Sequence, residues 1–248
     1  MNLDLQHARP RHDPADGILA LTRAQQDLLD SVSGLSDDDL RLPSGLAGWS
    51  RGHVTAHLCR SADALRNVLI GAETGTPRPM YPNPQSRDDD IARDGVRPAV
   101  VQIADLDRSG TDLLAHARRL SAAVWDVPVT LRTGRVSPAG RLLTHRLTEV
   151  LIHHVDLAVG YTSAMWPYEA APQLLVQLVG DLAERTDHPP VEVLALDTGD
   201  RYRIGGMPGA PVRVRGLTHE LVAWLSGRGV SEDLTCEPGP LPQLPAWM

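Results

Sequence analysis

The sequence lacks lysine altogether, because all 24 of its lysine-plus-arginine residues are arginines. A chain without lysine has no side chain for a Schiff base, for a pyridoxal attachment or for the lysine of a P-loop phosphate site. It also holds only 2 cysteines, Cys59 and Cys236, which show no CxxC spacing. They predict neither a disulfide framework nor a thiolate metal cluster. Any metal site must therefore use histidine and carboxylate ligands.

Long apolar runs and long basic runs are missing as well. No stretch reaches the roughly 18 apolar residues of a membrane-spanning helix, and the first residues lack the apolar core of a secretory signal. The formal net charge is -7, and without a basic run the chain does not offer the surface that nucleic acids bind. We therefore expect a protein of the cytoplasm whose partners are small molecules, with no nucleic acid and no membrane. Separately, we expect a monomer.

The chain is long enough for one large hydrophobic core or two modest ones, with 248 residues of which 42% are hydrophobic. Apolar residues recur at helical spacing in the first two thirds of the chain. They predict helices over residues 14–32, 51–73, 98–123 and 138–159. Ser50 is a favourable cap for the second helix. Connections of moderate length between these helices predict a four-helix bundle.

Two of the connections carry signals of their own. The segment 77–90 holds many prolines, which predicts an irregular loop. Residues 127–138 place β-branched side chains on both sides of a Thr-Gly pair, which predicts a short hairpin.

The pattern changes near residue 165. One further helix is expected over residues 173–186 and another over residues 218–229. Between them, three alternating segments predict strands over residues 191–198, 201–206 and 210–216. This mixture predicts an α+β protein with two domains. We expect the bundle over residues 1–165 and a smaller mixed domain over residues 166–248.

Histidine and glutamate gather on two of the predicted helices. His53 and His57 lie four residues apart on the second helix, and His145, Glu149 and His153 repeat this spacing on the fourth. Residues four apart share one face of a helix. Such polar groups are costly inside a bundle unless they are paired or bound to a metal. Bundles that bind metals build the site from inward histidine and glutamate on facing helices.

Each of these motifs also has a simpler explanation. A histidine pair at this spacing is common in helices without a metal, and glutamate and histidine four apart often form only a surface hydrogen bond. Two such motifs on different helices, both interleaved with apolar positions, make a divalent metal site as good an explanation as packing. The available ligands suit zinc or another divalent transition ion.

Four stretches of the chain resemble one known family. They are "GWSRGHVTAHL", "PMYPNPQSRDDDIA", "LTEVLIHHVDLAVGY" and "GLTHELVAWLSGRG". Together they are similar to the mycothiol-dependent maleylpyruvate isomerases, which belong to the DinB-like metal-binding bundles. The resemblance runs from about residue 15 to the end of the chain. It implies a DinB-like four-helix bundle followed by a smaller domain.

The resemblance also implies a set of metal ligands. The positions that match the family's ligands are His57, Glu149 and His153. By this correspondence His53 is a neighbour of the site rather than a ligand. His145 stands where the family has an apolar residue, which leaves open a fourth ligand or an altered cavity. Three protein ligands leave positions on zinc free for catalysis.

The activity implied by the resemblance is the isomerisation of maleylpyruvate to fumarylpyruvate in gentisate-type degradation of aromatic compounds. Zinc would bind and deprotonate mycothiol, whose thiolate adds to the double bond, permits rotation and leaves. Arg228 would hold a carboxylate of this unsaturated dicarboxylate substrate, and Tyr81 and Arg87 would line the cofactor pocket. Two alternatives stay open: a mycothiol S-transferase that conjugates electrophiles, and a metal-binding bundle without catalysis. Within the sequence, only the loop that contains Tyr81 favours the isomerase.

Overall fold

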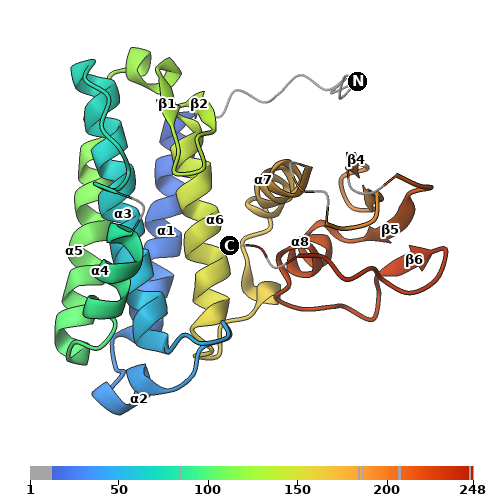
Figure 1. Ribbon diagram of the computed structural model, residues 1–248, viewed down its shortest axis with the longest axis horizontal. Helices are drawn as coiled ribbons and strands as arrows, with labels where there is room; N and C mark the ends of the chain where they lie inside the picture. The colour runs from blue at the N-terminus through green and yellow to red at the C-terminus, as the bar shows by residue number, and fades with distance from the viewer. Residues whose placement is uncertain are drawn as a thin grey trace.

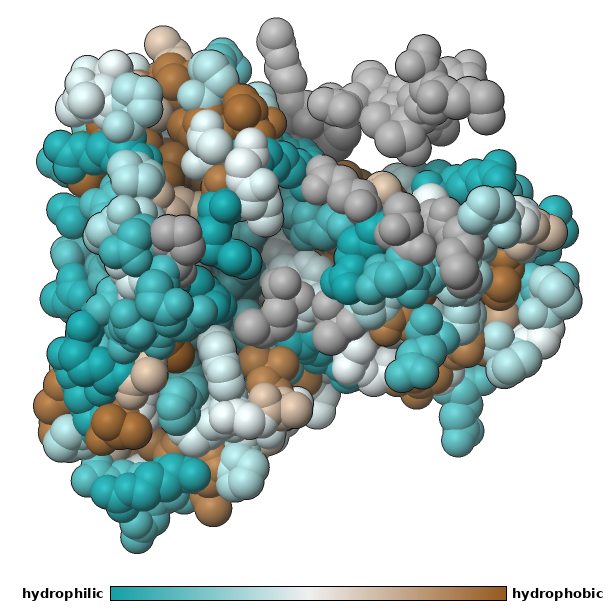
Figure 2. Space-filling model, in the orientation of Figure 1, coloured by the Kyte–Doolittle hydropathy of each residue, from teal (hydrophilic) through white to brown (hydrophobic). Residues whose placement is uncertain are grey.

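The computed structural model describes residues 13–83, 85–183, 185, 187–205, 208–245 and 247. Long helices stand side by side in one half of the molecule, and a smaller part with helices and a sheet lies beside them (Figure 1). This arrangement confirms the predicted α+β class. Figure 2 shows hydrophilic side chains over much of this face of the bundle, and a hollow where the bundle meets the C-terminal part. Among the described residues, no helix combines the length and the apolar character needed to cross a membrane.

Four long helices form the bundle, as the apolar spacing predicts. They are α1 (Pro14–Val32), α3 (Arg51–Thr74), α5 (Ala99–Ala117) and α6 (Arg141–Asp156). Helix α3 packs against α5 and α6, while α1 packs against α6 and α5. The core between them is made of buried aliphatic side chains, among them Leu28, Leu58, Leu106 and Leu147. Burial of such side chains is the main stabilising contribution to the bundle.

The start of α3 is fixed by local hydrogen bonds and by a close contact between helices. Ser50 caps the helix, as expected, because its Oγ accepts a hydrogen bond from the backbone N–H of His53 at 3.3 Å. One turn in, Gly52 lies directly against the backbone carbonyl of Gly95. A methyl group at Gly52 would overlap that oxygen, so only glycine lets the turn between α4 and α5 lie so close to α3.

The connection predicted as an irregular loop over residues 77–90 contains the start of a short helix. Helix α4 spans Ser86–Asp94. The prolines of that segment end at position 84, and Asp88 and Asp89 then occupy the first turn of α4, where negative charge is favourable. At the end of α4, the buried carboxylate of Asp94 forms an ion pair with Arg60 of α3 at 2.7 Å. The prediction therefore failed where acidic residues follow the prolines.

Other boundaries differ by a few residues. The short helix α2 (Asp37–Arg41), capped by Ser36, was not expected. The helix predicted over residues 98–123 stops earlier, at Ala117, and a 3₁₀ turn, η1 (Ala122–Asp126), follows. Helix ends depend on tertiary contacts as much as on local pattern, which explains shifts of this size.

The predicted hairpin is present and contacts α3 and α6 of the bundle. Strand β1 (Pro128–Thr130) pairs in antiparallel fashion with β2 (Val136–Pro138). In the turn, the backbone N–H of Leu131 donates to the Arg135 carbonyl at 2.8 Å. Gly134 has φ +83°, a conformation that favours glycine. The turn therefore holds Arg132 and Thr133 at a defined place above the helices.

The C-terminal part combines two helices with a four-stranded sheet. Its elements are α7 (Ala171–Ala183), β3 (Val191–Ala195), β4 (Arg201–Ile204), β5 (Val212–Gly216), α8 (Thr218–Ser226) and β6 (Thr235–Glu237). The strand order is β4-β3-β5-β6, with β3 and β5 parallel and the other pairs antiparallel. The sequence predicted the first three strands but not β6. Helices α7 and α8 pack on each other and on the sheet. We propose the domain boundary near residue 165, at the end of the turn η2 (Ser163–Met165).

Candidate metal centre and its cavity

Helices α3 and α6 bring His57, Glu149 and His153 together. His57 Nε2 lies 2.8 Å from Glu149 Oε2 and 3.1 Å from His153 Nε2. Glu149 Oε2 lies 3.5 Å from His153 Nε2. One ligand atom from each residue lies within 4.8 Å of the others. Two imidazole nitrogens and a carboxylate oxygen that converge in this way form a donor set suited to a divalent transition ion.

The ring of His153 is oriented by a neighbour on the same helix. Its Nδ1 lies 2.8 Å from Asp156 Oδ2. Because the carboxylate accepts hydrogen bonds, the proton is held on Nδ1, and Nε2 is directed at the other two donors. A histidine held by a carboxylate in this way is typical of metal ligands. The geometry of His153 therefore fits a metal-bound imidazole.

Two of the three groups at this centre are in the charge state that a metal ligand needs. Burial is the main cause that lowers the pKa of His57 to about 4, so this imidazole is neutral at pH 7. Burial alone would raise the pKa of Glu149, but hydrogen bonds from His153 and His57 hold it well below its usual value. Burial disfavours the charged form of His153, whereas its hydrogen bonds to Asp156 and Glu149 outweigh this and raise its pKa. The centre thus contains an ionised carboxylate and a neutral His57.

The two other histidines of the sequence motifs lie beside the centre. His53 Nδ1 lies 2.7 Å from Ser50 Oγ, so this side chain belongs to the cap of α3. His145 lies one turn before Glu149, with Nε2 at 3.8 Å from Glu149 Oε1. It lines the cavity but is not part of the group of three converging donors.

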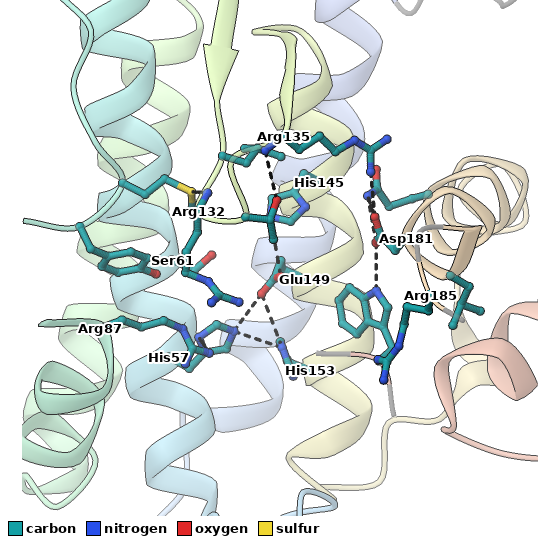
Figure 3. A pocket seen from close by; sticks show the side chains of 17 residues that line it. His57, Ser61, Arg87, Arg132, Arg135, His145, Glu149, His153, Asp181 and Arg185 are labelled. Carbon is teal, nitrogen blue, oxygen red and sulfur yellow. Dashed lines mark hydrogen bonds and ion pairs between the residues drawn. The ribbon is translucent and has the colours of Figure 1, made fainter. Parts of the chain in front are cut away.

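A cavity of about 220 Å³ opens in front of the three converging side chains (Figure 3). Its wall combines residues from α3, α4, α6, α7, the β1–β2 turn and the end of the chain. Trp247 closes one side: its ring centroid lies 5.9 Å from that of His153, and its indole N–H donates to Asp181 at 3.1 Å. The bundle and the C-terminal part therefore both contribute to the space where a ligand would meet the centre.

Tyr81 and Arg87, expected to line a cofactor pocket, both line this cavity. Arg87 Nη2 lies 3.4 Å from His57 Nδ1, and its guanidinium lies 5.8 Å from the Trp49 ring. Burial raises the pKa of Tyr81, so its phenol stays protonated and can donate a hydrogen bond. The structure thus brings both residues to the cavity wall, with Arg87 beside His57.

Arg228, expected to contact the substrate, does not line the cavity. Its Nε and Nη2 donate to the two oxygens of Asp156 at 2.9 and 2.8 Å. Its Nη1 donates to the backbone oxygens of Ser226 and Trp247. All three nitrogens therefore have protein acceptors. Direct contact with a substrate carboxylate stays a prediction, and it would require these bonds to change.

Comparison with known proteins identifies the family. The model of the mycothiol maleylpyruvate isomerase N-terminal domain matches residues 21–158, more than half of the chain. The chain belongs to this family. Two solved structures are also similar to it: the mycothiol-dependent maleylpyruvate isomerase and a histidine-to-alanine mutant of that enzyme. Each has a TM-score of 0.85 and 26% sequence identity, over 95% of this chain and 97% of the other. No curated protein matches the chain significantly.

The match to the isomerase family covers the converging donors but not the whole cavity. It ends at residue 158, just after Asp156, so Arg228 and Trp247 lie beyond it. The likeness to the solved isomerase, at 95% of the chain, includes the C-terminal part as well. The family match and the likeness to the solved isomerase therefore both support the same arrangement of the site.

Sequence reasoning missed three residues that shape the site. The spacing of three between His153 and Asp156 on one helix was an available signal, because it places the carboxylate beside the ring. Trp247 comes from the proline-rich end of the chain, which carries no periodic pattern. Arg132 is one of 24 arginines, and only the folded hairpin brings it to the cavity.

Proposed function

We propose that the protein is a mycothiol-dependent isomerase that converts maleylpyruvate to fumarylpyruvate. The observation that carries this proposal is the convergence of His57, Glu149 and His153 at the wall of a cavity. It occurs in a chain that resembles a solved mycothiol-dependent maleylpyruvate isomerase over 95% of its length. The partners are then an unsaturated dicarboxylate and a low-molecular-weight thiol.

In this proposal the three converging side chains hold one divalent ion, with zinc as the best match to two imidazoles and a carboxylate. His153 would bind through Nε2, since Asp156 keeps the proton on Nδ1. His57 would also bind through Nε2, which leaves its own proton on Nδ1. The guanidinium of Arg87 only donates hydrogen bonds, so it would then lose this acceptor and become available to a ligand.

The protein's own cysteines do not supply a nucleophile. Burial raises the pKa of Cys59 to about 12, and this thiol lies in the core of the bundle. Cys236 lies on β6 and does not line the cavity. Bound together, zinc and mycothiol would supply a thiolate near neutral pH, and its addition to the double bond would permit rotation before it leaves again.

The remaining cavity residues orient the reactants. Tyr81 offers a phenolic O–H, and Arg87 offers a guanidinium beside His57. We propose that both contact the thiol cofactor or the substrate where these meet the centre. Arg228 supports His153 through Asp156 in the described conformation. Holding the reacting atoms in a fixed arrangement is itself a large part of catalysis.

The decisive experiment mixes zinc-loaded protein with mycothiol and maleylpyruvate and identifies the products by NMR. Fumarylpyruvate formed without consumption of thiol supports the isomerase. A stable thiol adduct would show an S-transferase instead, and unchanged reactants with bound zinc would show a metal-binding bundle without catalysis. His57→Ala is the matched negative variant, because it removes one proposed ligand and should abolish turnover.

A further inference from the structure

Positive charge is unevenly balanced around the cavity. The arginines that line it are Arg87, Arg132, Arg135 and Arg185. Three of them form an ion pair with an aspartate: Arg87 with Asp88 at 2.7 Å, Arg135 with Asp181 at 3.1 Å and Arg185 with Asp187 at 2.8 Å. Arg132 has no acidic side chain within ion-pairing distance in the described part of the chain. Of these four arginines, Arg132 is the one without an ion-pair partner among the described residues.

The backbone of Arg132 is nevertheless held in place. Its N–H donates to Sδ of Met80 at 3.2 Å, which ties the β1–β2 turn to the loop before α4. The turn itself is closed by the hydrogen bond of 2.8 Å from the Leu131 N–H to the Arg135 carbonyl. Figure 3 shows the side chain of Arg132 reaching from the hairpin into the cavity toward Glu149. With its backbone fixed and its guanidinium unbonded to any described residue, this side chain is preorganised to bind a ligand.

A phenolic hydrogen-bond donor, Tyr81, lines the same cavity as this guanidinium. Burial raises the pKa of its phenol while the positive charges of Arg87 and Arg132 oppose that effect. The negative charge of Glu149 also acts on this phenol. Tyr81, Arg87, Arg132 and Glu149 thus line one cavity. A guanidinium and a phenolic O–H are together suited to a carboxylate.

We propose that Arg132, with the hydroxyl of Tyr81, forms an anion subsite that binds one carboxylate of the dicarboxylate substrate. The identity of this ligand rests on the proposed function. Arg228 is a poorer candidate for the same contact, because its nitrogens are already bonded to Asp156 and to backbone oxygens. No described residue forms a hydrogen bond or ion pair with the side chain of Arg132, so a bidentate pair with a ligand would break no such bond. It therefore determines specificity for acidic substrates.

The test measures binding separately from turnover. Zinc-loaded protein without thiol is titrated calorimetrically with maleate, and its affinity for mycothiol is measured in parallel. Arg132→Gln should weaken maleate binding about 10- to 100-fold, as expected for loss of a charge-assisted bidentate contact. Arg132→Lys should fall between Arg132→Gln and the wild type, because it keeps the charge but lacks the planar fork. Zinc content and mycothiol affinity should not change.

The matched control is Arg201→Gln, which makes the same change of charge at an exposed position on β4 away from the cavity. It should bind maleate like the wild type. Maleate binding within twofold of the wild type in Arg132→Gln overturns the subsite, as does a wild-type protein that binds no maleate. A parallel loss of mycothiol affinity would assign Arg132 to the cofactor instead.

The same variants separate this subsite from the proposed function. If maleate binding depends on Arg132 but the protein does not isomerise maleylpyruvate, the anion subsite is supported and the proposed function is refuted. If Arg132→Gln isomerises maleylpyruvate with an unchanged KM for that substrate, the proposed function is supported and the anion subsite is refuted.

Discussion

Replacing Arg228 with alanine tests whether this residue acts through His153. A continuous set of hydrogen bonds links the two: Arg228 donates to both oxygens of Asp156 at 2.9 and 2.8 Å, and Asp156 Oδ2 lies 2.8 Å from His153 Nδ1. Without the guanidinium, the Asp156 carboxylate is free to turn, and the ring of His153 is less firmly oriented. We therefore expect Arg228→Ala to weaken metal binding, although Arg228 contacts Asp156 and not the three proposed metal ligands.

The size of the effect follows from burial. The side chains of Arg228 and Asp156 are only 7% and 4% exposed, so the variant leaves a buried carboxylate without its charged partner. Loss of one member of a buried pair destabilises a protein by about 3 to 5 kcal/mol. Loss of the carboxylate that orients a ligand histidine typically lowers metal affinity by about 10- to 100-fold. Arg228→Ala keeps the carboxylate but orients it less firmly, so its loss of metal affinity should lie within or below that range.

Two measurements follow the two effects. Competition with a chelator gives zinc affinity, and urea unfolding of the metal-free protein gives the free energy of unfolding. Arg228→Lys should lie between the wild type and Arg228→Ala, because an ammonium group pairs with Asp156 at one point only. Asp156→Asn keeps the shape and an acceptor oxygen but loses the charge, and should weaken zinc binding in the same direction.

One outcome would refute this reasoning. If Arg228→Ala keeps zinc affinity within twofold and unfolds like the wild type, Asp156 needs no partner to orient His153. If the KM for maleylpyruvate then rises sharply in the same variant, the direct carboxylate contact implied by the family resemblance is supported instead.

Three further predictions address the site and its supporting helices. Zinc content by elemental analysis should fall strongly in His57→Ala and Glu149→Gln but stay near normal in His53→Ala; the reverse order for the two histidines would contradict the assigned ligands. Asp94→Asn should lower the free energy of unfolding by about 1 to 3 kcal/mol at pH 7, because the buried carboxylate accepts bonds from several arginines. Burial disfavours the charge of Asp94, yet the hydrogen bond from Arg93 and the charges of other arginines lower the pKa of Asp94 below 3.8. The difference in free energy of unfolding between Asp94→Asn and the wild type should therefore persist above pH 3.8 and vanish as the pH falls through the lowered pKa. Gly52→Ala should cost about 1 to 3 kcal/mol in urea unfolding, since its methyl group meets a backbone carbonyl; unchanged stability would show that the helices can separate there.

The sequence by itself determined the features that depend on near neighbours in the chain. Helical spacing placed Glu149 and His153 on one face of α6, and both do lie on the face toward α3. Ser50 was a cap by residue type and position, and the structure confirms it. The Thr-Gly pair predicted a hairpin that is present. Each of these outcomes follows from local backbone geometry, which a few consecutive residues can encode.

Only the tertiary structure decided which side chains from distant parts of the chain meet. Spacing alone could not decide whether His53 or His57 meets the donors of α6, because both lie on one face of α3. The position of α6 along that face brings His57 to Glu149, a residue 92 positions away. The bond from Arg228 to Asp156 spans 72 positions, and Arg132 reaches the cavity only because the hairpin folds over it. Helix periodicity specifies a direction within one element, whereas the rotation and height at which elements pack are set by the whole core.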